Sequence, residues 1–143
     1  MSLDRIFVDY SIDRLRQHSA RIEKRLAELT DEEVWYRAKG ANATGNLVLH
    51  LCGNVRQWIV SSIGGAPDTR VRDQEFAARG SVAASELRGR LHGTVEEAIA
   101  VIAALTPERL LERVKPQNHD VTVMEAVYHV VEHFAWHTGQ IAT

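Results

Sequence analysis

Three histidines recur at intervals of four residues near the C-terminus, within the segment AVYHVVEHFAWHTGQIAT: His129, His133 and His137. Residues four apart lie along one stripe of an α-helix, with Cβ atoms about 6 Å apart, so two neighbouring imidazoles can bind one ion. Neutral imidazole nitrogens suit zinc, nickel, copper and ferrous iron. The spacing therefore predicts a metal site, a pH-sensitive surface, or histidines that simply pack and hydrogen-bond inside a bundle.

The helical period ranks these histidines unequally. At about 100° per residue, the apolar arc that holds Val130 and Phe134 also takes in His137 and borders His133. His129 lies further toward the edge of this arc. We therefore expect His133 and His137 to face the core, and His129 to support them from the side or to line a pocket at the solvent edge.

A third candidate ligand, His50, borders the core-facing stripe of the segment GNLVLHLCGNVRQWIVSSI. Three protein ligands leave one position open, as in catalytic zinc sites, where the metal lowers the pKa of bound water to about 7. Histidines on half-apolar faces are also commonly hydrogen-bonded core residues. The HVVEH stretch spells the inverted zinc-protease pattern HxxEH, but that interpretation leaves His137 unused and requires Glu132, which lies off the arc.

The elements that must position these residues are predicted to be helices. Apolar residues recur with helical spacing and no segment alternates with period two, so we expect no sheet. Thr30 with Glu33 has the form of a capping box and predicts a further short helical turn. The long helices are predicted over residues 5–29, 44–63, 84–105 and 123–143. Four such helices imply an all-α four-helix bundle, in which sites are built in the core from facing helices.

Between the second and third helices, residues 66–81 are polar and read as a long loop, a candidate pocket lid. Arg70, Arg72 and Glu75 on this loop could meet a charged cofactor, or form a solvated charge cluster. Pocket walls could also come from Asn54, Trp58 and Trp136, although large aromatic residues at helical spacing commonly serve packing.

Composition narrows the function classes. The 143 residues fit a single domain over 1–143, and the net charge of −2, with both signs interspersed, argues against nucleic acid or an anionic membrane as partner. Cys52, the single cysteine, excludes a disulfide framework, and it lies about 200° from His50, so we do not expect it as a fourth ligand. With neither a signal peptide nor a membrane-spanning run in the sequence, we expect a cytoplasmic protein.

Two stretches together resemble the DinB/YfiT-like family of metalloenzymes: GNLVLHLCGNVRQWI around His50, and HVVEHFAWHTGQI around His133 and His137. The intervening GGAPDTRVRDQEF is similar to one branch of that family, and the resemblance covers nearly the whole chain. By this resemblance the family's metal ligands fall on His50, His133 and His137, while His129 has no place among them. It also implies a bundle with a long crossover loop, often a homodimer, that holds zinc or nickel.

The resemblance further implies an activity. Relatives include thiol S-transferases that use bacillithiol, mycothiol or glutathione, and a mycothiol-dependent maleylpyruvate isomerase. The sequence therefore favours a divalent-metal-dependent enzyme acting on a small molecule, either a thiol-dependent S-transferase or a related hydrolase. No side chain is assigned as catalytic, because metal-bound thiolate or water would react. The alternative is a non-catalytic metal-binding or dimeric interaction module.

Overall fold

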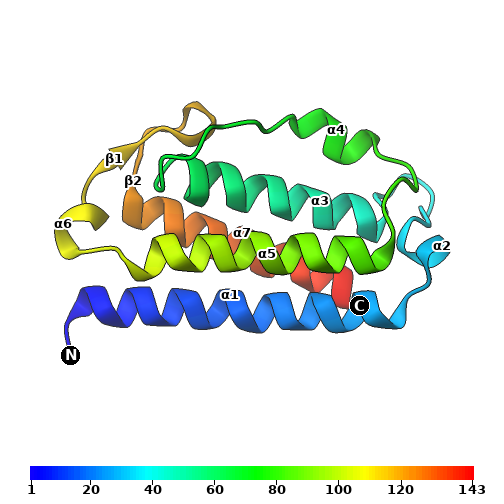
Figure 1. Cartoon of the computed structure of the whole chain (residues 1–143), viewed down its shortest axis with the longest axis horizontal. Helices are drawn as coiled ribbons and strands as arrows, with labels where there is room; N and C mark the ends of the chain where they lie inside the picture. The colour runs from blue at the N-terminus through cyan, green and yellow to red at the C-terminus, as the bar shows by residue number, and fades with distance from the viewer.

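Four long helices lie side by side in the computed structural model, which describes all 143 residues (Figure 1). They are α1 (Leu3–Glu28), α3 (Thr44–Val55), α5 (Ala84–Ala103) and α7 (Val123–Ala142). α1 packs against α5 and α7, and α3 packs against the same two helices, so α1 and α3 are diagonal partners. This arrangement confirms the predicted all-α four-helix bundle.

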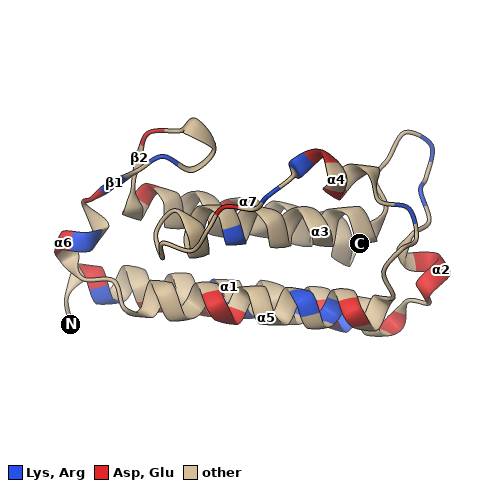
Figure 2. Cartoon of the chain, turned by 45° about the horizontal axis from the view of Figure 1, so that its top comes forward, with Lys and Arg blue, Asp and Glu red and all other residues tan.

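The apolar faces of these helices meet in one core cluster of 28 buried residues. Phe134, Leu51 and Leu91 are among its largest fully buried side chains. Figure 2 shows basic and acidic segments interspersed along α1 and α5, so charge of one sign does not gather on that side of the bundle. None of the helices combines the length and apolar character that crossing a membrane requires.

The structure departs from the sequence-based expectation at the end of α3. The helix continues as η1 (Arg56–Ser61), a six-residue π-helical segment in which the amide of Ser62 donates to the carbonyl of Gln57 at 3.1 Å. A π-helix adds residues per turn and changes the direction of the side chains that follow, and such segments are frequent at functional sites. It places Trp58, 3% exposed, against α7.

The connections contain short elements that the sequence analysis missed. The predicted loop 66–81 includes a short helix, α4, and the expectation of no sheet is wrong because two two-residue strands pair antiparallel. Elements of this length cannot display a recurring period, and their stability comes from tertiary contacts. They are α4 (Arg72–Ala77), α6 (Pro107–Leu110), β1 (Arg113–Val114), η2 (Pro116–Asn118) and β2 (Val121–Thr122). The short helix α2 (Asp31–Val34), by contrast, begins at the predicted capping box of Thr30 and Glu33.

The start of α7 is fixed by a capping box. The amide of Glu125 donates to the Thr122 hydroxyl at 3.1 Å, and the amide of Thr122 donates to the Glu125 carboxylate at 2.8 Å. Replacing Thr122 by alanine removes the side-chain acceptor and should lower the free energy of unfolding by about 1 kcal/mol. Urea denaturation measures this loss, with the exposed Thr69→Ala as control, and equal midpoints for both variants would contradict it.

Candidate metal centre

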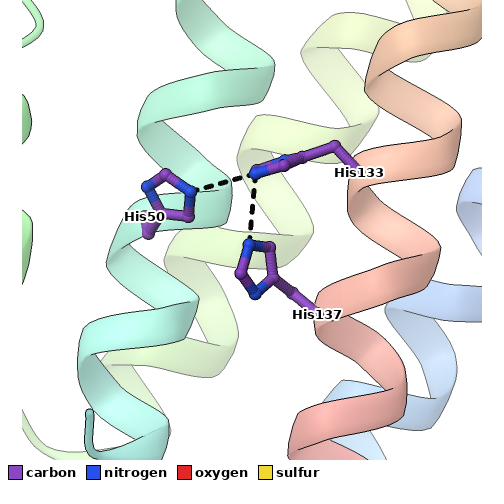
Figure 3. A group of neighbouring side chains, drawn as sticks. All are labelled: His50, His133 and His137. Carbon is purple, nitrogen blue, oxygen red and sulfur yellow. Dashed lines mark hydrogen bonds between the residues drawn. The ribbon is translucent and has the colours of Figure 1, made fainter. Parts of the chain in front are cut away.

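Three imidazoles meet between α3 and α7. His50 projects from α3, and His133 and His137 project from successive turns of α7 toward it (Figure 3). His133 Nε2 lies 3.0 Å from His50 Nε2 and 3.1 Å from His137 Nε2, and one ring nitrogen from each residue falls within 4.8 Å of the other two. The structure therefore brings together the three histidines that the sequence singled out, although His50 and His133 are 83 residues apart in the chain.

This donor set fits a divalent metal ion. Two nitrogens bound to one tetrahedral zinc ion at about 2.0–2.1 Å lie about 3.3 Å apart, close to the separations from His133. Burial, with His137 and His50 adding to it, lowers the pKa of His133 to about 3. Burial also lowers the pKa of His137 below its ordinary value. Neutral rings are the form that binds metal.

The remaining ring nitrogens have three different environments. His50 Nδ1 lies 3.0 Å from the Glu75 carboxylate, and His137 Nδ1 lies 2.6 Å from the side-chain oxygen of Gln140. His133 Nδ1 is buried without a hydrogen-bond partner inside the protein. The three candidate ligands are thus supported by a carboxylate, by an amide and by packing alone.

Glu75 is held in turn by Arg70, whose Nε and Nη2 donate to its two carboxylate oxygens at 2.9 and 3.0 Å. Burial alone would raise the pKa of Glu75, but hydrogen bonds from His50 and Arg70 outweigh it and hold this pKa below its usual range. Both side chains are nearly buried, so this part of residues 66–81 is a packed ion pair and not a solvated charge cluster.

The histidine burial has a consequence for stability without metal. Unfolded histidines bind protons near pH 6.5, whereas folded His133 does so only near pH 3, so protons favour the unfolded chain between these values. Metal-free protein should therefore unfold at lower urea concentration at about pH 5 than at about pH 7.5, and His133→Gln should reduce this difference. Urea midpoints that do not change with pH, or that change equally in His133→Gln, would contradict a lowered pKa of His133 in the folded protein.

The other candidate residues surround the cluster at different depths. His129 is exposed, and its ring stacks on Trp58 with centroids 4.1 Å apart. Asn54 and Trp58 are buried, and each has a polar atom without a partner in the protein. Trp136, 71% exposed, lies on the outer surface of α7.

Arg72 and Phe76 extend the surroundings of His50 along α4. The guanidinium of Arg72 lies over the Phe76 ring at 5.2 Å, and that ring lies 4.8 Å from the His50 ring. Arg72 is exposed, unlike Arg70 and Glu75 from the same segment. Phe76 is therefore a neighbour of the cluster that the sequence analysis did not single out.

Asn46 and Gly53 on α3 were also missed. Asn46 is fully buried, and its side-chain amide donates to the backbone carbonyls of Glu75 and Ala78, each at 3.0 Å, which anchors α4 on α3. A Cβ on Gly53 would overlap the Glu75 carboxylate. Glycine inside an otherwise regular helix is the one sequence signal of such a close approach.

Two further features lie apart from the three histidines. Burial raises the pKa of the Cys52 thiol to about 12, so the thiol stays protonated, whereas the thiolate is the form that binds metal. Cys52 is also absent from the cluster of possible ligands. A cavity of about 490 Å³ is lined by Gly53, Arg70 and Glu75 but by none of the three histidines. It reaches the outer side of the Glu75–Arg70 pair, so it is not where a ligand would meet the ring nitrogens.

A helical bundle with three histidines converging from two facing helices defines a class of candidate metalloproteins. A sequence model of the mycothiol-S-transferase family matches residues 12–143, and the chain belongs to this DinB-like family. The resemblance to DinB/YfiT-like proteins is thereby confirmed. No curated protein sequence matches the chain.

Solved structures share the fold at low sequence identity. A conserved protein from Enterococcus faecalis has a TM-score of 0.76 and 17% identity, with 99% of this chain and 94% of that chain covered. A DinB-like protein from Bacillus cereus has a TM-score of 0.66 and 16% identity, with 87% and 81% covered. A mycothiol-dependent maleylpyruvate isomerase has a TM-score of 0.74 and 14% identity; all of this chain is covered but only 64% of the isomerase.

Proposed function

We propose that the protein is a divalent-metal-dependent S-transferase that uses a low-molecular-weight thiol, with His50, His133 and His137 as the metal ligands. The observation that carries the proposal is the convergence of three imidazole nitrogens, with the pKa of His133 lowered to about 3 so that its ring stays neutral. Zinc and nickel are the ions we favour, since borderline divalent metals suit imidazole. Family membership supports mycothiol ahead of bacillithiol or glutathione as the thiol.

The proposed reaction joins the thiol sulfur to a carbon atom of a second substrate. A divalent ion at this site would supply a positive charge that keeps the thiol sulfur as thiolate at neutral pH. The thiolate sulfur would form a bond to an electrophilic carbon of the second substrate, whose leaving group departs with the bonding electron pair. Phe76 lies beside His50, and the exposed Arg72 lies over the Phe76 ring; these two side chains would bind an apolar and an anionic part of that substrate.

Thiol consumption tests this proposal. Protein purified without an affinity tag and loaded with zinc or nickel is mixed with each of the three thiols and a panel of alkyl and aryl halides. We expect loss of free thiol with at least one halide, fastest with mycothiol, and no loss above background after chelation. Metal-loaded protein that consumes none of the three thiols would contradict transferase activity.

The same protein samples test the alternatives. Ester and amide substrates hydrolysed without thiol would assign a metal-dependent hydrolase instead. Stoichiometric metal without turnover in either assay would assign a non-catalytic metal-binding module. A low-molecular-weight thiol is available only where it is kept reduced, so the proposal includes a cytoplasmic location.

A homodimer is the second part of the proposal. Large apolar side chains remain exposed on the neighbouring helices α1 and α7, where a second copy could cover them. They are Leu3, Ile6 and Tyr10 on α1 and Met124, Tyr128 and Trp136 on α7. Sedimentation equilibrium should give about twice the chain mass of 16.0 kDa, and a monomer at all concentrations would contradict this part alone.

A further inference from the structure

Glu75 contacts His50 on the ring nitrogen that faces away from the other histidines. His50 Nε2 points to His133, while His50 Nδ1 lies 3.0 Å from Glu75 Oε1. Both residues are buried, His50 at 5% and Glu75 at 8% exposure. The Glu75 contact therefore acts on the candidate ligand without occupying the place of an ion.

The position of one proton decides whether His50 can bind metal. A neutral imidazole carries a hydrogen on one nitrogen and a lone pair on the other. An ionised carboxylate only accepts hydrogen bonds, so Glu75 favours the form in which Nδ1–H donates to it and Nε2 keeps its lone pair.

Arg70 could favour the opposite form, because its Nη2 also lies 3.2 Å from His50 Nδ1. Donation from Arg70 to Nδ1 would place the ring hydrogen on Nε2 and block metal binding. That form would also leave the Nδ1 lone pair facing the ionised Glu75 oxygen at 3.0 Å with no hydrogen between them. The guanidinium donates to both oxygens of Glu75, and its Nη1 donates to Gln57 at 2.9 Å. Arg70 therefore holds Glu75 in place and does not compete with it for His50.

We propose that Glu75, held by Arg70, is a positioning residue that fixes the ring hydrogen of His50 on Nδ1 and presents the Nε2 lone pair to the metal. The role in metal binding rests on the proposed function, whereas the placement of the hydrogen does not. His50 is the only one of the three candidate ligands with a carboxylate partner, since His137 faces Gln140 and His133 Nδ1 has none. Carboxylate partners of this kind orient ligating histidines and raise their basicity.

The fold contains two devices that bring Glu75 to this place. Asn46, one turn before His50 on α3, binds the carbonyl of Glu75 itself, so one helix holds both the ligand and the segment that supports it. Gly53, the next turn after His50, leaves room for the ion pair, because its Cβ would overlap the Glu75 carboxylate and lie 2.9 Å from Arg70 Nε.

Zinc affinity of Glu75→Gln is the first test, measured by competition with a chromophoric chelator. A glutamine side chain has one oxygen and one NH2 group, so either way round the NH2 group faces a donor: Arg70 Nε in one orientation, and the His50 and Arg70 nitrogens at Oε1 in the other. The hydrogen of His50 is then no longer fixed. We expect zinc affinity to fall by about 10–100-fold. The matched control is Asp73→Asn, which removes the same charge from an exposed position of α4 and should stay within about twofold.

Gly53→Ala provides a second variant that changes neither a ligand nor Glu75. The added methyl group displaces the ion pair, so zinc affinity should fall in the same direction. Gly89→Ala on α5 is its control. A Cβ at Gly89 meets nothing within 4 Å, and both exchanges improve helix propensity equally, so only the contact with the ion pair differs. Folded Glu75→Gln and Gly53→Ala variants that bind zinc as tightly as the parent would overturn the proposal.

Nitrogen-15 NMR of metal-free protein reads the hydrogen directly. Two-bond proton–nitrogen correlations distinguish Nδ1–H from Nε2–H rings, and His50→Gln assigns the His50 signal. We expect Nδ1–H in the parent protein and a shift toward Nε2–H in Gly53→Ala. An Nε2–H ring in the parent would overturn the proposal, and this result does not depend on whether Glu75→Gln folds. Absence of zinc binding to the parent would instead contradict the proposed function and leave this readout intact.

Discussion

Replacing His133 by alanine is expected to reduce the affinity for zinc or nickel by between about a hundredfold and a thousandfold, the share of one ligand in a typical zinc site. His133 is the central member of the cluster, since its Nε2 lies 3.0 and 3.1 Å from the corresponding nitrogens of His50 and His137. The neighbouring His129 ring is stacked on Trp58, outside the group of convergent nitrogens, so we do not expect it to replace His133. Isothermal titration of metal into the tag-free protein measures the loss.

His129→Ala is the matched control for this experiment. It removes the same side chain one helical turn earlier on α7, outside the group of convergent nitrogens. The metal affinity of His129→Ala should stay within about tenfold of the parent's, because His129 can influence the ion only through its contact with the neighbouring His133 ring. Equal losses in the two variants would show that the metal ligands are wrongly assigned.

Phe134→Ala should produce the largest loss of stability, about 3–5 kcal/mol in the free energy of unfolding. The Phe134 ring has no exposed surface, packs in the core with the His18 ring stacked at 6.4 Å, and follows the candidate ligand His133 in the chain. Its removal leaves a cavity between α1 and α7. Since small domains are stable by only about 5–15 kcal/mol, urea denaturation should show a clearly lowered midpoint.

Trp136→Ala is the control for core packing, because it removes a larger ring from a 71% exposed position two residues away. Its unfolding free energy should lie within about 0.5 kcal/mol of the parent. Excess zinc should recover part of the Phe134→Ala loss, since a ligand that binds only the folded state stabilises it. Equal effects of the two substitutions would mean that α7 is not anchored through Phe134.

The sequence predicted the long helices and the direction of their histidines well, because the helical period ties residue number to side-chain direction. His50, His133 and His137 each border an apolar stripe, so burying the stripes brings the rings together. The same reasoning placed His129 at the edge, where its ring is exposed beside Trp58. The role of these residues in metal binding stays a prediction.

The surroundings of the cluster could not be predicted in the same way. Glu75 and Arg70 come from a segment without a period, and their burial depends on Asn46 and Gly53 of another helix. The wider turn of η1 has no sequence signature, although it determines where Trp58 meets His129. Such tertiary contacts become visible only when the chain is folded.

The separation of the candidate ligands along the chain gives an ion at this site a further effect. His50 and His133 are 83 residues apart, so an ion bound to both would hold together two distant parts of the chain for as long as the protein is folded. A ligand that binds only the folded state stabilises it by about 4 kcal/mol when its free concentration is about a thousand times its dissociation constant. Bound metal would thus stabilise the packing of α3 against α7. It would slow amide hydrogen exchange in both helices together.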